Sequence, residues 1–175
     1  MKSKIQRAIH GVAVLCMGVW VGGAVAATAL APTSGTVQCV YGSPSAYLDI
    51  GNGTCSEWNH RAMLQGSTYY KYYGGCASSC SGGSSCNGGA GNYYVVTGAN
   101  GWDFRQSLFN ANVSSGTKTC DRCALGLIGA SGSATGPLAR SDNRQYGTRK
   151  SAWLSPSLSC GQSLSGGEVV GYPML

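Results

Sequence analysis

The chain has 175 residues and a formal net charge of +6 at pH 7, from twelve basic and six acidic side chains. Its length suits one domain with a core of its own. Three basic residues, Lys2, Lys4 and Arg7, open the chain, and without them the net charge is +3. So small a charge does not indicate a nucleic-acid-binding protein.

Residues 1–26 have the three parts of a secretory signal peptide. After the basic start, residues 11–26 are uncharged and end in Ala24-Val25-Ala26. We therefore expect an N-terminal hydrophobic helix that is cleaved after residue 26. The alternative is a membrane anchor retained to about residue 31, because residues 11–31 carry no charge and 20 residues suffice to cross a ~30 Å hydrocarbon layer. Either way we expect bacterial Sec-type export to a secreted, periplasmic or cell-surface location.

Eight of the nine cysteines follow this segment. An even set of cysteines behind an export signal predicts four disulfides. The chain is also rich in glycine, with 28 residues, so covalent links that each contribute ~2–4 kcal/mol are expected to stabilise a sparse core. The predicted disulfide cysteines are Cys39, Cys55, Cys76, Cys80, Cys86, Cys120, Cys123 and Cys160.

The first part of the exported chain predicts strands and one helix. Residues 27–36 are expected to be an exposed leader, followed by a single domain over residues 37–175. Residues 36–50 have a β-like composition. Residues 54–57, Thr-Cys-Ser-Glu, fit a helix capping box, so a short helix is predicted over residues 55–65.

The centre of the chain alternates between aromatic and glycine-rich segments. Residues 67–73 predict a strand, and residues 74–91 form a Gly/Ser segment with three cysteines, so at least one disulfide must leave that segment if all eight pair. Residues 93–97 and 102–104 predict a hairpin around Asn100-Gly101.

The last part of the chain is harder to assign. Residues 119–128 predict a short helix or a buried strand, and residues 129–151 a long polar loop. Residues 153–154 and 169–170 predict late strands. The expected fold is a β-rich, irregular, disulfide-stabilised single domain with one or two short helices.

Two cysteines have the spacing of a redox motif. Cys120 and Cys123 would exchange thiols if they stood at a helix N-terminus, but the surrounding sequence lacks the βαβ units of a thioredoxin-type domain. Together with Cys76 and Cys80 they would also make a four-thiolate zinc set. Structural disulfides are the favoured interpretation, and no metal and no cofactor is predicted.

Hydrolytic chemistry finds little support in the residues. His60 is the only histidine after the signal, and a surface or capping role is favoured for it. His60 and Glu57 are weak catalytic candidates, and Asp49 with Glu57 or Asp103 would be an acidic pair.

The most unusual candidate for a binding surface is the run Tyr69-Tyr70-Lys71-Tyr72-Tyr73. On a strand, the first, third and fifth of these residues share one face, and Tyr70 shares the other with Tyr72. Rigid amphipathic rings suit contacts with sugars or proteins. Packing between strands is the alternative.

A second candidate is a basic loop that could meet anionic lipid, polysaccharide or phosphate. A solvated loop is the alternative. The four residues are Arg140, Arg144, Arg149 and Lys150.

These observations favour a secreted or cell-surface binding or structural protein over an enzyme. It would be a component of an extracellular appendage, envelope or virion-like assembly, or an adhesive module, with itself or a surface glycan or protein as partner. A membrane partner is expected only if the N-terminal helix is retained. The alternatives are a small exported hydrolase using His60 or an acidic pair, and a basic toxin acting on membranes.

Overall fold

The computed structural model describes residues 27–39, 46–56, 60–110, 116–155 and 158–175. The predicted signal peptide and its hydrophobic helix, residues 1–26, lie outside the described residues. No helix within the described ranges is long and apolar enough to cross a membrane.

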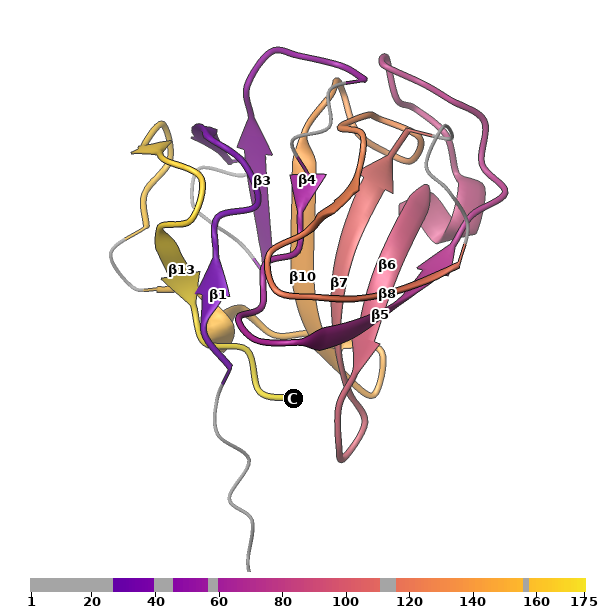
Figure 1. Cartoon of the computed structure of the whole chain (residues 1–175). Helices are drawn as coiled ribbons and strands as arrows, with labels where there is room; N and C mark the ends of the chain where they lie inside the picture. The colour runs from indigo at the N-terminus through magenta and orange to yellow at the C-terminus, as the bar shows by residue number, and fades with distance from the viewer. Residues whose placement is uncertain (1–26, 40–45, 57–59, 111–115, 156–157) are drawn as a thin grey trace, which may run out of the picture.

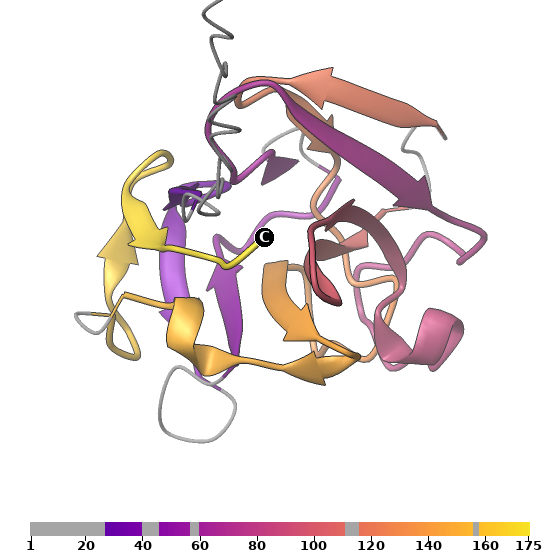
Figure 2. The same cartoon turned by 90° about the horizontal axis from the view of Figure 1, so that it is seen from below.

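One antiparallel sheet dominates the fold, with strand order β12-β2-β3-β10-β7-β6-β5-β8 and β11 paired to β10. Figures 1 and 2 show that its strands follow a curved path around the interior. The strands are β2 (Gly35–Gln38), β3 (Tyr47–Gly51), β5 (Thr68–Tyr73), β6 (Asn92–Thr97), β7 (Trp102–Phe109), β8 (Thr117–Cys120), β10 (Ala139–Gln145), β11 (Thr148–Arg149) and β12 (Ser163–Leu164).

Two short ribbons and two 3₁₀ turns complete the described fold. β1 (Ala29–Leu30) pairs with β13 (Val169–Gly171), and β4 (His60–Arg61) pairs with β9 (Ala124–Gly126). The 3₁₀ turns are η1 (Cys86–Gly89) and η2 (Ser151–Trp153). The prediction of a β-rich, disulfide-stabilised fold is therefore confirmed.

The hydrophobic core lies on the inner face of the curved sheet. Successive residues of a strand point to opposite faces, so every second side chain turns inward. The two small ribbons also contribute to this core, because Leu125 in β9, and Ala29 and Val170 in the β1–β13 ribbon, are fully buried in it. The inward residues of the sheet include Val37, Leu48, Ile50, Tyr70, Tyr94, Val96 and Phe104.

The predicted hairpin is confirmed. β6 and β7 pair in register from Tyr93 with Ser107 to Thr97 with Asp103. Asn100 and Gly101 both have positive φ, at 53° and 74°, which is the backbone that an Asn-Gly turn supplies.

The predicted helix over residues 55–65 is wrong. Its described part is extended: His60–Arg61 form β4, and Leu64 makes a bridge with Ala29. The capping-box threonine is used locally instead, because the backbone N–H and the hydroxyl of Thr54 both donate to Asn52 Oδ1, at 3.0 and 2.6 Å. Pairing with other strands therefore overrides the helical pattern.

The prediction of an exposed leader over residues 27–36 is also wrong. Ala29 and Ala31 are fully buried, and the Leu30 N–H donates to Met63 O at 2.9 Å. This segment is apolar because it is part of the core.

The polar stretch 129–151 contains a hairpin where a loop was predicted. β10 lies between β3 and β7 at the centre of the sheet, and β11 returns beside it. Tyr146 and Gly147 form the turn, with φ of 48° and 78°. The strand was missed because both of its faces carry polar side chains.

Two further segments resolve open predictions. For residues 119–128 the sequence left a short helix or a buried strand open, and residues 124–126 form the strand β9. The predicted strand at residues 153–154 is wrong at Trp153, which ends η2, whereas residues 169–171 form β13 as expected.

Four disulfides link the eight predicted cysteines: Cys39–Cys160, Cys55–Cys80, Cys76–Cys86 and Cys120–Cys123. One bridge leaves the Gly/Ser segment, as its odd number of cysteines requires. That bridge is Cys55–Cys80, and it ties the segment to the chain before β4.

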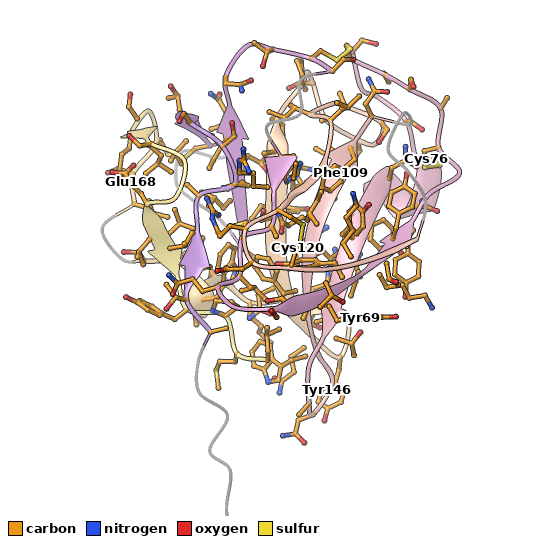
Figure 3. All side chains as sticks on the ribbon, viewed as in Figure 1. Tyr69, Cys76, Phe109, Cys120, Tyr146 and Glu168 are labelled. Atoms are coloured by element: carbon orange, nitrogen blue, oxygen red, sulfur yellow. A yellow bond between two sulfur atoms is a disulfide. The ribbon has the colours of Figure 1, made fainter. Side chains whose placement is uncertain are left out.

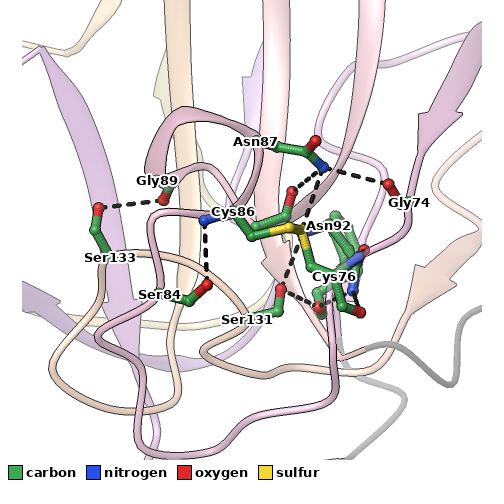
Figure 4. The surroundings of a disulfide bond; sticks show 11 residues. Gly74, Cys76, Ser84, Cys86, Asn87, Gly89, Asn92, Ser131 and Ser133 are labelled. Carbon is green, nitrogen blue, oxygen red and sulfur yellow. Dashed lines mark hydrogen bonds between the residues drawn. A yellow bond between two sulfur atoms is a disulfide. The ribbon is translucent and has the colours of Figure 1, made fainter.

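The Gly/Ser segment is ordered by asparagine side chains as well as by disulfides (Figure 4). The amide of Asn92 is fully buried; it accepts from Cys76 N–H at 3.0 Å and donates to Cys76 O at 3.1 Å. Asn87 Nδ2 donates to Gly91 O at 2.9 Å. The Asn92 amide thus pairs with the backbone N–H and C=O groups of Cys76, as a neighbouring strand does within a sheet.

We predict that Asn92→Ala lowers the free energy of unfolding by about 2–4 kcal/mol, because it leaves the buried N–H and C=O groups of Cys76 unpaired. Urea unfolding of the oxidised protein measures this change. Ser133→Ala removes an exposed hydroxyl that bonds to Gly89 of the same segment, and its effect should stay within ~0.5 kcal/mol. Equal losses in the two variants would contradict the role of the buried amide.

Candidate functional site

The outward side chains of the central strands form one continuous surface, which we call the outer face. It spans β5, β6, β7, β10, β11 and β3, and it includes the odd-numbered positions of the predicted tyrosine run. Its residues are Tyr69, Lys71, Tyr73, Tyr93, Val95, Asp103, Arg105, Arg140, Asp142, Arg144, Arg149, Tyr47 and Asp49.

Two tyrosine rings stack at one side of the outer face. Tyr73 lies opposite Tyr93 in the β5–β6 register, and their ring centres are 4.8 Å apart with planes inclined by 10°. Lys71 Nζ lies 5.3 Å from the centre of the Tyr73 ring, and Arg105 Cζ lies 5.1 Å from that of Tyr93. Cations over ring faces hold the rings in place.

A hollow of about 260 Å³ lies next to this stack. Its lining combines aromatic rings, aliphatic groups and one charged pair, in which Arg105 Nε lies 3.5 Å from Asp103 Oδ1. The lining residues are Tyr73, Tyr93, Val95, Thr97, Gly101, Trp102, Asp103 and Arg105.

Tyr146 adds a further ring beside the hollow. The tip of the β10–β11 hairpin places Tyr146 77% exposed, as Figure 3 shows at the bottom of the molecule. A Cβ atom built on Gly101 would lie 2.4 Å from Tyr146 Cδ1, so the ring rests directly against this glycine of the lining. Only glycine at position 101 allows that contact.

The acidic side chain of this hollow is Asp103, and burial changes its pKa. Partial burial raises the pKa of Asp103, although the nearby Arg105 opposes that change. Burial therefore disfavours the charged form of Asp103. Its Oδ1 is enclosed, whereas the side chain as a whole is 23% exposed.

The predicted basic cluster is largely neutralised by ion pairs. Arg140 Nε and Nη2 each lie 2.8 Å from an oxygen of Asp49. Asp142 Oδ2 accepts from Arg144 at 2.8 Å and from Arg149 at 2.9 Å. The four predicted residues lie on or beside β10 and β11, so the prediction of a solvated basic loop is wrong.

The predicted tyrosine run divides between two faces, as its alternation requires. Tyr69 and Tyr73 are 59% and 37% exposed, whereas the fully buried Tyr70 hydroxyl accepts from Leu64 N–H at 3.2 Å. Burial raises the pKa of Tyr70. Tyr72 also points inward, where its ring centre is 4.9 Å from that of Tyr94. The alternative of packing between strands is therefore confirmed for Tyr70 and Tyr72, whereas a binding role for the outward tyrosines stays a prediction.

His60 lies in the core and not at the surface or at a helix cap. Its ring stacks on Phe109 at 4.0 Å between centres, and neither nitrogen has a hydrogen-bond partner among the described residues. Burial lowers the pKa of His60 to about 3, so the imidazole is neutral near pH 7. Glu57, the other weak catalytic candidate, lies outside the described residues.

The remaining chemical candidates are accounted for by the disulfides. Cys120 and Cys123 pair with each other, while Cys76 and Cys80 pair with different cysteines. The four-thiolate set is therefore not formed. Among the described residues, no group of three or more histidine, cysteine or acidic side chains is placed to hold a metal ion.

Sequence reasoning missed the residues that complete the hollow, Tyr93, Trp102 and Arg105. The predicted hairpin contained the signal. Because side chains alternate along a strand, Tyr93, Val95 and Thr97 lie on one face of β6. Across the Asn100-Gly101 turn, Asp103 and Arg105 lie on the same face of β7, beside Thr97 and Val95. Only the pairing of β5 with β6 could show that the tyrosine run joins them.

No protein-family model matches this chain, and no curated protein sequence matches it. Among solved structures, the M23 metalloprotease pseudoalterin, described as from the deep sea, is similar over 73% of this chain and 71% of its own. The two share 18% sequence identity with a TM-score of 0.37. This likeness is too distant to assign a fold family or an activity.

We predict that protonation of His60 destabilises the fold at acid pH. Because its folded pKa of about 3 lies below its ordinary 6.5, only the unfolded chain binds the proton in that interval. The contribution is therefore fully present above pH 6.5 and is lost, at about 1 kcal/mol per pH unit, as the pH falls towards 3. His60→Phe should lack this slope.

Urea unfolding of both proteins between pH 4 and 8 measures the difference, because carboxylate titration is common to the two. The free-energy gap should widen in favour of His60→Phe as the pH falls. A gap that stays constant over this range would show that His60 is not buried as a neutral ring.

Proposed function

We propose that this protein is an exported, disulfide-stapled binding domain that contacts a carbohydrate ligand through the hollow of the outer face. The observation that carries the proposal is the stacked Tyr73–Tyr93 pair at the edge of a hollow that also contains Trp102. Tyr73 and Tyr93 stack on each other and have Lys71 and Arg105 over their rings, so they would offer a sugar their ring edges and hydroxyls. Trp102 would supply the flat apolar surface for the C–H groups of the sugar.

The charged pair of the hollow suits sugar hydroxyls. The Asp103 carboxylate accepts hydrogen bonds and the Arg105 guanidinium donates them, so together they match a hydroxyl pair. The two are 3.5 Å apart at Arg105 Nε and Asp103 Oδ1 and offset each other's charge. The hollow therefore favours a neutral ligand.

The same charge arrangement argues against the toxin alternative. The arginines of β10 and β11 are engaged by Asp49 and Asp142 within the sheet. A cationic surface for anionic lipid needs positive charges that are not already paired. The hydrolase alternative has no support from His60, which is neutral and enclosed in the core.

The size of the hollow suits one sugar ring. Its volume of about 260 Å³ is slightly below the ~300–1,000 Å³ of pockets that enclose drug-sized molecules. One sugar ring is thus the expected occupant, with low affinity. A polysaccharide repeats that ring along its length, so it would offer many such sites to a protein that binds each of them weakly.

The place of action that we propose is outside the cytoplasm. Four disulfides in a chain of 175 residues fit an oxidising compartment. Residues 1–26 would serve as the signal peptide, and a secreted, periplasmic or cell-surface location follows. Retention as an anchor remains the alternative within this proposal.

The runner-up partner for this face is protein, including a second copy of this chain. Tyrosine and arginine are enriched at protein interfaces, and both surround the hollow. The edge strand β8 lies next to β5 and presents backbone groups that a further strand could pair with. Assembly through this face would make the protein a structural component.

We predict that Tyr73→Ala weakens binding to an insoluble polysaccharide such as chitin, cellulose or peptidoglycan by about tenfold, which is 1.4 kcal/mol. The change removes an exposed ring without touching the core. Co-sedimentation with each polymer gives the affinity. A change in tryptophan fluorescence that is lost in Trp102→Phe reports soluble oligosaccharides, because Trp58 and Trp153 also fluoresce. Tyr172→Ala is the matched control, since Tyr172 is 53% exposed beside β13 and outside the outer face.

Sedimentation velocity of the same variants separates the two partner classes. Loss of polymer binding in Tyr73→Ala alone supports the carbohydrate proposal. Concentration-dependent self-association that Tyr73→Ala abolishes, without any polymer binding, would replace it by assembly. Equal behaviour of Tyr73→Ala and Tyr172→Ala in both assays would remove the hollow from either function.

A further inference from the structure

A second hollow lies away from the outer face, and its volume is about 490 Å³. Five separate parts of the chain line it: the segment after β1, the turn after β3, β4, the Cys120–Cys123 loop, and the turn before β13. Its lining residues are Pro32, Thr33, Ser34, Asn52, Thr54, Arg61, Arg122 and Gly166. We call it the arginine pocket.

The redox-like motif is what presents the first arginine of this pocket. Arg122 stands between the disulfide partners Cys120 and Cys123 and has a φ of +57°, a conformation that is uncommon for a residue with a long side chain. The disulfide closes the loop, in which Asp121 is exposed and Arg122 is half-buried.

Backbone carbonyls fix the direction of the Arg122 guanidinium. Nη1 donates to Ala62 O at 3.0 Å, and Nη2 donates to Ala31 O at 3.1 Å. These acceptors are neutral, so they orient the group without cancelling its charge. The arginine joins β1 to β4 and reaches the wall of the pocket.

The second arginine increases the positive charge of the same wall. Arg61 is exposed on β4, and its Nη1 lies 3.4 Å from Arg122 O. Burial lowers the pKa of Arg122 and the charge of Arg61 lowers it further, whereas the charge of Asp121, which is not part of the pocket lining, opposes this change. Two guanidiniums that repel each other in this way gain from an anion placed between them.

Arg61 and Arg122 differ from the other described arginines, each of which forms an ion pair with a carboxylate. Arg105, Arg140, Arg144 and Arg149 each have a carboxylate within 4 Å, whereas no carboxylate of the described residues comes within that distance of Arg61 or Arg122. Every other polar group that lines the pocket is an uncharged hydroxyl or amide. The positive charge of the pocket is therefore not balanced by its own lining.

Short hydrogen-bonded turns hold the polar groups opposite the arginines. Ser34 Oγ accepts from Gly166 N–H at 2.9 Å, so its hydroxyl proton is left to donate. Asn52 Nδ2 lies 3.5 Å from Thr33 Oγ1, and Asn52 Oδ1 is occupied by Thr54. The Thr33 and Thr54 hydroxyls already donate, to Ser34 O and Asn52 Oδ1. The pocket thus combines fixed guanidinium donors with one hydroxyl donor, that of Ser34.

We propose that the arginine pocket binds an oxyanion, a carboxylate, phosphate or sulfate group, between Arg61, Arg122 and the Ser34 hydroxyl. Guanidinium groups recognise such anions through paired N–H donors. This binding does not depend on the carbohydrate hollow, since the two hollows share no residue. The Cys120–Cys123 disulfide then has the role of positioning Arg122, and no thiol exchange is needed.

The test is a titration of the full mature chain with sodium acetate, phosphate and sulfate at pH 7 and constant ionic strength, followed by ¹⁵N-detected shifts of the arginine Nε–H groups. Saturable shifts confined to Arg61 and Arg122 are expected. Arg61→Gln should weaken the binding at least tenfold. Because Arg61 is exposed, this variant keeps the core, whereas Arg122 variants would also remove contacts with β1 and β4.

Arg149→Gln is the matched control. It makes the same change in net charge on the outer face, and Asp142 keeps Arg144 as a partner. Equal weakening in Arg149→Gln and Arg61→Gln, or shifts spread over all arginines, would show general charge screening and overturn the proposal.

Glu57→Gln tests an internal occupant, because Glu57 is four residues before Arg61 in the chain and lies outside the described residues. Anion binding that is unchanged in Glu57→Gln supports an external ligand. Binding that appears only in Glu57→Gln would mean that this carboxylate fills the pocket in the native protein, and would overturn the proposal.

Discussion

The buried amide of Gln106 connects the two layers of this protein. Gln106 points inward from β7 and is fully buried; its Oε1 accepts from Met63 N–H at 3.0 Å, and its Nε2 donates to Arg61 O at 2.7 Å. Both bonds satisfy backbone groups that would otherwise be unpaired in the core. The same strand turns Asp103 and Arg105 outward, so the hollow of the outer face and the segment that carries Arg61 are positioned from one strand.

Side-chain amides and disulfides order segments of this protein that are not held by helices or long strands. In the Gly/Ser segment there are few apolar side chains to bury, and Cys76–Cys86 and Cys55–Cys80 limit its freedom while Asn92 pairs its backbone. The Cys120–Cys123 loop follows the same logic at a smaller scale. Covalent closure fixes where the chain goes, and polar side chains fix how its backbone is satisfied.

The protein pairs the arginines of its outer face with carboxylates, whereas the two arginines of the arginine pocket have no carboxylate in the pocket lining. On the outer face Asp49 and Asp142 sit among arginines, so a partly buried polar strand is tolerated at the centre of the sheet. In the arginine pocket two guanidiniums meet uncharged groups only. This contrast separates arginines that stabilise the fold from arginines that are available to a ligand.

The sequence by itself determined the local properties of this protein: a β-rich chain, eight cysteines ready to pair, a hairpin at Asn100-Gly101, and alternating faces for the tyrosine run. These follow from turn chemistry and from the two-residue period of a strand, which act between near neighbours. Only the tertiary structure decided which cysteines pair, that residues 60–61 are a strand and not a helix, and that β10 is a central strand. It alone joined Tyr73 to Tyr93 and Arg61 to Arg122, because contacts across the sheet and through the core depend on residues far apart in the chain.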